Sequence, residues 1–208
     1  MPKVYFYKLT ADSGGAPYVT SDLLTLAICK PMIRRMAERG DLIFGFAANS
    51  LSKDNRLIYV ACVTGKLCNG KYYKDSEYAK RSDCIYTFEA GRYFWRRGSV
   101  HHCSEDLEHD LGPYPDYPNA NVLLSTDFRY FGKAASANYR TEFPLVYQAV
   151  KHLGRGHRVW HTPALRDEFL LLKDWIWQNN RKMKIGEPTS KPLRRRCHRD
   201  TSCGVVKS

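Results

Sequence analysis

The chain has 208 residues, of which 43% are hydrophobic and 26% charged, enough apolar sequence for one domain with a buried core. The mean hydropathy is −0.50, and no apolar run approaches the roughly 18 residues of a membrane-spanning helix. The chain opens on strand-like sequence rather than a secretory signal, and no internal period repeats. We therefore expect a globular cytoplasmic protein whose seven cysteines are reduced thiols.

The charge balance is strongly basic, with 33 Lys and Arg against 21 Asp and Glu and a formal net charge of +12. Such a balance favours a polyanionic partner, because the release of counterions from phosphates drives binding. Residues 184–208 hold seven basic and two acidic side chains, so the remaining chain is basic as well. A soluble basic protein without a nucleic-acid partner would have the same composition, and that alternative stays open.

In chain order, apolar runs predict strands over residues 3–9, 41–48, 56–64, 85–89 and 121–132, and helical spacing predicts helices over 30–39, 143–153 and 163–180. We expect a single α+β domain over residues 1–185, built on a small curved mixed sheet or open β-barrel with flanking helices. Residues 186–208 are basic and poor in apolar side chains, and we expect a disordered tail there.

The first candidate site is basic and lies at the start of the first predicted helix. Lys30 precedes Pro31, and Arg34 and Arg35 follow on the next turn, where all three could hold phosphates. A solvated helix face would have the same pattern.

The second candidate site interleaves aromatic rings with guanidinium groups. Aromatic rings stack on unpaired bases, and arginines neutralise phosphates. A hydrophobic patch with solvated charges is the alternative. The residues of this candidate are Arg92, Tyr93, Phe94, Trp95, Arg96 and Arg97.

The third candidate site lies in residues 101–110, the densest run of titratable groups. A histidine beside a carboxylate can move protons near neutral pH, although a charged surface loop has the same composition. Adjacent histidines in a strand point to opposite faces, and a zinc site needs about three protein ligands. We therefore expect no bound metal, with His101 or His102 facing a pocket and the other packed or solvated. Cys197, His198 and Cys203 also lack a second pair of zinc ligands.

Several segments together resemble the nucleotide-modification-associated domain proteins of bacteria and phages, over roughly residues 3–178. They are CKPMIRR (29–35), GDLIFGF (40–46), RLIYVACVT (56–64), GSVHHCSEDLEHDL (98–111) and NVLLSTDFRYFG (121–132). The matching positions are Cys29, Lys30, Pro31, Ile33, Arg34, Arg35, Gly40, Asp41, Ser99, His101 or His102, Asp110, Ser125, Phe128, Tyr130, Phe131 and Gly132. The resemblance implies a role near modified DNA bases. A second resemblance, at the level of the fold, is to the PUA, ASCH and EVE barrels, which hold a nucleobase in a pocket.

The preferred prediction is a nucleic-acid-binding protein, for DNA rather than RNA, that recognises or helps modify a nucleobase. In this interpretation Lys30, Arg34 and Arg35 hold phosphates. The base stacks on an aromatic ring, with Tyr93, Phe94, Trp95 and Tyr130 as candidates.

Two other functions remain open at this point. In a hydrolase or transferase acting on a base or nucleotide, His101 or His102 is the acid–base group, Asp110 orients it, and Ser125 or Asp41 assists. In a protein-interaction module, the basic tail alone recruits nucleic acid. No Gly-x-Gly-x-x-Gly or Walker loop is present in the sequence, so we expect no nucleotide cofactor.

Overall fold

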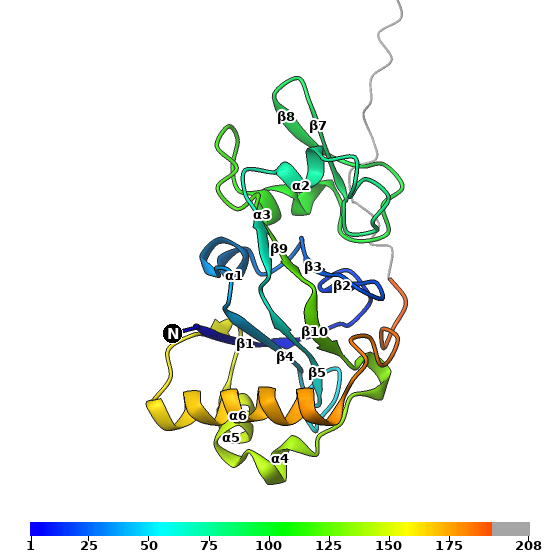
Figure 1. The fold of residues 1–208 in the computed structure, drawn as a ribbon. Helices are drawn as coiled ribbons and strands as arrows, with labels where there is room; N and C mark the ends of the chain where they lie inside the picture. The colour runs from blue at the N-terminus through cyan, green and yellow to red at the C-terminus, as the bar shows by residue number, and fades with distance from the viewer. Residues whose placement is uncertain (193–208) are drawn as a thin grey trace, which may run out of the picture.

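The structure is a computed structural model that describes residues 1–192, and its main element is a five-stranded mixed sheet (Figure 1). The strand order is β10-β5-β4-β1-β11, with β1 and β4 parallel and every other neighbouring pair antiparallel. β1 and β4 are apolar at almost every position because both of their faces are covered. The strands are β1 (Val4–Leu9), β4 (Leu42–Ala47), β5 (Leu57–Cys62), β10 (Asp127–Tyr130) and β11 (His157–Arg158).

Helices cover one face of this sheet, as Figure 1 shows for α6 (Pro163–Asn179). The Thr162 hydroxyl accepts a hydrogen bond from the Leu165 N–H and caps α6, and Pro163 occupies the first turn. Phe169 of α6 packs on Phe6 and Phe44 of the sheet. The other helices are α1 (Pro31–Met36), α2 (Lys71–Lys74), α3 (Leu107–Leu111), α4 (Tyr139–Glu142) and α5 (Pro144–His152), with 3-10 turns η1 (Ser104–Asp106) and η2 (Gly132–Ala134).

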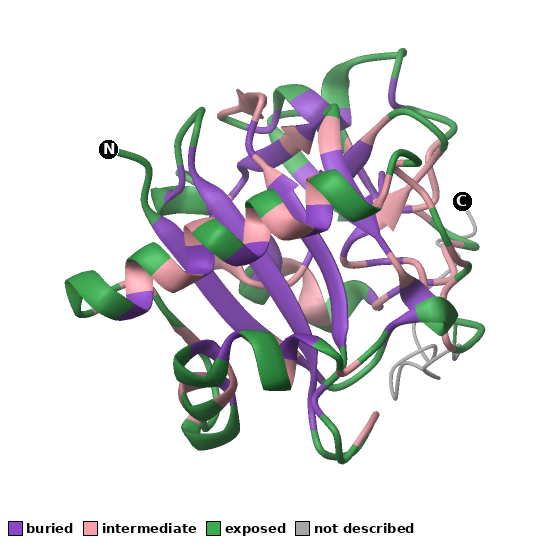
Figure 2. Cartoon of the chain, turned by 60° about the horizontal axis from the view of Figure 1, so that its bottom comes forward, coloured by how far each residue is buried: buried purple, intermediate pink, exposed green. Residues whose placement is uncertain are grey.

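A second, four-stranded antiparallel sheet packs on the opposite face. Its strand order is β2-β3-β9-β6, and Leu26 of β3 and Leu123 of β9 share a core with Tyr7 of β1. Figure 2 shows the buried strands between their more exposed coverings. The strands are β2 (Tyr18–Val19), β3 (Leu24–Leu26), β6 (Gly65–Leu67) and β9 (Val122–Ser125).

The single strand expected over 121–132 is two strands. β9 ends at Ser125 and pairs with β3 and β6, whereas β10 begins at Asp127 and pairs with β5 of the other sheet. The Ser125 hydroxyl donates a hydrogen bond to the Asp127 carbonyl and closes the bend. One apolar segment therefore joins the two sheets.

A third core, rich in tyrosine, lies beneath the hairpin of β7 (Tyr86–Glu89) and β8 (Arg92–Trp95), which Figure 1 shows at the end of the molecule farthest from α6. Tyr72, Tyr73 and Tyr86 are buried there against Ile28, which continues from β3. This core connects the hairpin and α3 to the segment that leads into α1.

The observed architecture confirms the expected α+β class, with small curved sheets and flanking helices. Across residues 1–192 the strands form no closed barrel. No helix in this part of the chain is both long and apolar enough to cross a membrane.

Residues 187–190 pack on the body, although the sequence suggested that the tail begins at residue 186. The Thr189 hydroxyl and the Ser190 N–H each donate to the Asp12 carbonyl, at 3.0 Å, and the Thr189 N–H donates to the Asp12 carboxylate. The Lys133 N–H donates to the Glu187 carbonyl. Cys197, His198 and Cys203 lie outside the described residues.

Candidate functional site

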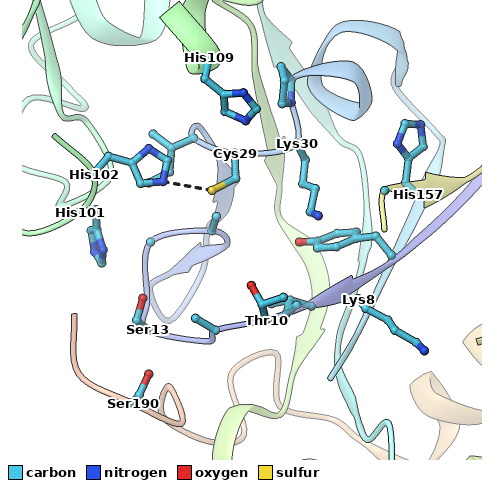
Figure 3. A pocket seen from close by; sticks show the side chains of 18 of the residues that line it. Lys8, Thr10, Ser13, Cys29, Lys30, His101, His102, His109, His157 and Ser190 are labelled. Carbon is cyan, nitrogen blue, oxygen red and sulfur yellow. Dashed lines mark hydrogen bonds between the residues drawn. The ribbon is translucent and has the colours of Figure 1, made fainter. Parts of the chain in front are cut away.

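A pocket of about 610 Å³ opens between the end of β1, the turn before α1 and the loop that precedes α3 (Figure 3). Its wall combines segments distant in sequence, including Ser190 of the C-terminal segment. The Cys29 thiol and the His102 imidazole both line the pocket, and they lie within hydrogen-bond distance of each other.

Cys29 lies in the turn between β3 and α1, in an unusual backbone conformation. The φ angles of Cys29 and Lys30 are 58° and 44°, in the left-handed region that side chains other than glycine rarely adopt. Such conformations concentrate at functional sites, where the surrounding structure has to hold them. Here the turn directs the Cys29 Sγ to within 3.2 Å of the His102 Nε2.

His102 is held from its other nitrogen by a buried carboxylate. The His102 Nδ1 lies 2.6 Å from the Asp110 Oδ2. Burial alone lowers the pKa of His102, but the hydrogen bonds and charges of Asp110 and Cys29 outweigh it and raise the pKa to about 10. His102 is therefore an imidazolium at neutral pH, and an imidazolium stabilises a neighbouring thiolate.

Asp110 is fully buried and accepts two further hydrogen bonds. The Cys29 N–H donates to the Asp110 Oδ1 at 2.8 Å, and the Tyr86 hydroxyl donates to the Oδ2 at 2.8 Å. Burial raises the pKa of Asp110, but His102, the charge of Arg34 and the Tyr86 hydrogen bond together hold it below its ordinary value. The carboxylate therefore stays ionised while it orients both Cys29 and His102.

Arg34 is a structural part of this site and does not face solvent. Its side chain is 0% exposed, and its guanidinium donates to the carbonyls of Cys29, Asp110, Asn119 and Asn121 at 2.6 to 2.7 Å. This corrects the expectation that Arg34 holds a phosphate, because a guanidinium with four protein acceptors has no free face. Arg35 is exposed and lies outside the pocket.

Both histidines line the pocket, although one of them was expected to face away. His101 and His102 precede the turn η1 rather than lying in a strand, and the φ of His102 is 54°, so the alternation of a strand does not apply. Burial and the neighbouring His102 charge lower the pKa of His101. Gly15 packs on the His101 ring, where a Cβ would come within 2.7 Å of Nδ1. His101 is therefore a neutral, tightly packed neighbour of the His102 pair.

Lys30 also reaches the pocket. Its Nζ lies 4.6 Å from the centre of the Tyr7 ring, and burial lowers its pKa. It remains a candidate for binding a phosphate.

Two other candidate catalytic residues lie away from the pocket. Asp41 accepts hydrogen bonds from the N–H groups of Lys3 and Glu38 and fixes the start of β4. Ser125 is buried at the bend between β9 and β10. Neither assists His102, because both belong to backbone turns outside the pocket lining.

Two of the proposed stacking residues are core residues. Tyr130 is fully buried, and its hydroxyl donates to the Asp12 carboxylate at 2.6 Å. Tyr93 is 5% exposed and packs on Tyr73 and Tyr117. The prediction that Tyr93 or Tyr130 stacks on a base is therefore wrong for this conformation.

The rest of the aromatic and basic segment lies on the β7–β8 hairpin and the turn after it. Phe94 is 48% exposed, and Arg92 and Arg97 are exposed as well. Trp95 and Arg96 are half-buried, and the Trp95 indole N–H faces the His101 carbonyl at 3.5 Å. This exposed surface is separate from the pocket but leads directly into the loop with His101 and His102.

Within residues 1–192, no group of three or more His, Cys, Asp and Glu side chains is arranged to hold a metal ion.

Sequence reasoning missed Cys29 as a functional residue. Counting the seven cysteines gave no reason to separate it from the others, and its partner His102 is 73 positions away. The usable signal was its place in the segment CKPMIRR, together with a histidine and an aspartate in a second matching segment.

Arg34→Lys should lower the free energy of unfolding by about 3 kcal/mol. A lysine ammonium group cannot donate hydrogen bonds to all four buried carbonyls that the planar arginine guanidinium contacts. Arg35→Lys, the matched change at the adjacent exposed position, should cost less than about 0.5 kcal/mol. Urea unfolding followed by circular dichroism measures both. Equal effects at the two positions would contradict the structural role of Arg34.

His102 should remain protonated from pH 6 to 8, because its pKa is raised from 6.5 to about 10, while His101 should titrate below 6.5. The raised pKa means that the His102 interactions stabilise the fold fully below pH 6.5, and this stabilisation is lost as pH rises through about 10. NMR titration of the imidazole protons measures both pKa values. Asp110→Asn should lower the pKa of His102, and an unchanged value would show that the carboxylate does not set it.

Comparison with known proteins assigns the chain to a family. Residues 1–194 match the description nucleotide modification associated domain 2, and the match covers the pocket, the buried Arg34 and the hairpin. Comparisons with curated proteins and with solved structures gave no match, so the expected likeness to PUA or EVE barrels stays a prediction. The family description associates the chain with nucleotide modification, and the family resemblance expected from the sequence is confirmed. The chain belongs to the nucleotide modification associated domain 2 family.

Proposed function

We propose that this protein is a thiol-dependent enzyme that transfers or hydrolyses an acyl group on a nucleotide or nucleobase. The observation that carries the proposal is the series Cys29–His102–Asp110, with distances of 3.2 and 2.6 Å, in which Cys29 and His102 line the pocket and Asp110 is buried behind them. A nucleophile, an acid–base group and a group that orients it are the parts that covalent acyl transfer needs.

The reaction follows from the protonation states at the site. The Cys29 sulfur attacks the carbonyl carbon of the substrate, a carbon–sulfur bond forms, and the bond to the leaving group breaks. His102 gives its proton to the leaving group. Water or an amine then attacks the thioester, His102 takes the proton of this second nucleophile, and the Cys29 sulfur leaves as a thiolate.

The choice of an enzyme over a binding module rests on the convergence of these groups. A module that only reads a base has no need for a thiol in a strained turn, held against an imidazolium by a buried carboxylate. The nucleotide as substrate comes from the family description and from the basic character of the chain. The amine or water that completes the reaction decides between transfer and hydrolysis.

Cys29 should react with iodoacetamide at pH 6 much faster than Cys62, because the Cys29 sulfur lines the pocket 3.2 Å from the positively charged His102, whereas burial raises the pKa of Cys62. Peptide mapping by mass spectrometry measures both rates in the same sample. His102→Gln should slow the labelling of Cys29 about tenfold or more and leave Cys62 unchanged.

The corresponding activity test uses mass spectrometry of nucleotides and digested DNA that have been incubated with the protein. Cys29→Ser should abolish any change of mass that the wild-type protein produces. Full activity in Cys29→Ser, or slow labelling of Cys29 in the wild type, would refute nucleophilic catalysis.

The exposed hairpin favours nucleic-acid binding as a second function. Phe94 offers a free ring between exposed arginines, and the Arg92 guanidinium lies 4.5 Å from the centre of the Tyr114 ring. Aromatic rings and arginines on one surface suit a single strand, whose bases stack while its phosphates are neutralised. Because this surface leads into the loop of His101 and His102, it could present a strand to the pocket.

If the hairpin binds DNA, the logarithm of the affinity should fall linearly with the logarithm of salt concentration. Arg92→Ala and Arg97→Ala should each reduce the slope by about 1. Arg56→Ala makes the same charge change at an exposed position immediately before β5 and should leave the slope unchanged. Fluorescence anisotropy with a labelled single strand measures the slopes, and equal slopes in all variants would exclude the hairpin.

A further inference from the structure

The pocket that holds Cys29 is lined by positive and titratable nitrogen groups and by no carboxylate. Three lysines, Lys8, Lys30 and Lys191, contribute to the lining, and so do four histidines. Neither Asp nor Glu occurs among the lining residues that the structure describes. The ligand of such a pocket is expected to be an anion, because an anion relieves the repulsion among these groups.

Lys30 is the most constrained of these cations. Its backbone is in the left-handed conformation, and its ammonium group extends over the Tyr7 ring, 4.6 Å from the ring centre. It is half-buried, and no carboxylate within residues 1–192 forms an ion pair with it. A half-buried ammonium without a counterion is costly, and burial accordingly lowers its pKa.

His157 faces the same part of the pocket from another strand. It lies on β11 directly opposite Tyr7 of β1, the residue whose ring the Lys30 ammonium group covers, and its own ring packs against Tyr5 with 6.2 Å between the ring centres. Lys30 and His157 both line the pocket, and burial and the charge of Lys30 lower the pKa of His157. Figure 3 shows Lys30 between Cys29 and His157, with His102 beyond Cys29.

We infer that Lys30 and His157 form an anion subsite that binds the phosphate of a mononucleotide and places the rest of that molecule beside the Cys29 thiol. The inference rests on the proposed function, because it assigns the phosphate to the substrate on which Cys29 acts. Lysine binds phosphate as a point charge, and a histidine adds a directed N–H donor that becomes charged when the anion arrives.

The size of the pocket favours a single nucleotide over a stretch of nucleic acid. A volume of about 610 Å³ is in the range of pockets that enclose one small molecule. One side of the pocket is lined by Ser190 and Lys191, and Ser190 is hydrogen-bonded to Asp12 through its N–H and its hydroxyl. The substrate class that the pocket favours is therefore the free nucleotide. Longer strands would bind at the exposed hairpin instead.

The test is calorimetric titration of the full chain with the 5′-monophosphates of deoxyadenosine, deoxyguanosine, deoxycytidine and thymidine, and with the four nucleosides. At least one monophosphate should bind about tenfold or more tightly than its nucleoside. Lys30→Gln and His157→Gln should each reduce this ratio to less than about threefold, whereas Lys30→Arg should retain it. Lys53→Gln, at an exposed position in the loop between β4 and β5, is the control and should leave the ratio unchanged.

Protection of Cys29 from iodoacetamide then locates the bound ligand. The monophosphate that binds should slow the alkylation of Cys29 but not that of Cys62. Equal affinities for monophosphate and nucleoside, no binding of any monophosphate, or protection by a single-stranded oligonucleotide alone would each overturn the inference. Because the titration does not depend on the reactivity of Cys29, a slow thiol refutes the proposed function, and a missing phosphate preference refutes the subsite.

Discussion

The buried pair of Arg34 and Asp110 is the interaction on which the site depends. Arg34 donates to the carbonyls of Cys29 and Asp110, and the Asp110 carboxylate accepts the Cys29 N–H in return. Burying these two charges is costly unless their polar atoms are paired, and here the guanidinium has four carbonyl acceptors. The contacts that offset this cost also fix the turn of Cys29 against the loop of His102. Stability of the fold and geometry of the site therefore have the same cause.

The charges of this network alternate in sign, and each one stabilises the next. The Arg34 guanidinium and the His102 imidazolium flank the Asp110 carboxylate, and His102 in turn faces the Cys29 sulfur. Because an arginine stays protonated, a positive charge remains 3.9 Å from the Asp110 carboxylate even when His102 gives up its own proton. The carboxylate can therefore orient the imidazole through both halves of a proton-transfer cycle.

The hydrophobic periodicity of the sequence correctly predicted those elements that run without interruption through one layer of the fold. The strand over 3–9 and the helix over 163–180 match β1 and α6 to within one residue at each end. The segment 121–132 was wrong as a single strand, because its bend depends on pairing with two different sheets. Arg34 and Arg35 are adjacent and chemically identical, and only the crossing of α1 with the segments around Asp110 and Asn121 buries one of them. No local sequence pattern distinguishes the buried arginine from the exposed one. The sequence therefore predicted Asp110 and both histidines as site residues but placed Arg34 on the surface.

The turn at Cys29 and Lys30 places the proposed nucleophile and the proposed phosphate-binding cation side by side. Two consecutive residues in the left-handed region cost on the order of 1–3 kcal/mol each, and the surrounding network has to offset this strain. The Arg34 bond to the Cys29 carbonyl and the Asp110 bond to the Cys29 N–H hold both sides of that peptide segment. A relaxed backbone would break these bonds and redirect the Sγ and the Nζ together. One strained turn therefore positions both the proposed nucleophile and the proposed anion-binding group, and a change that relaxes the turn should remove both properties at once.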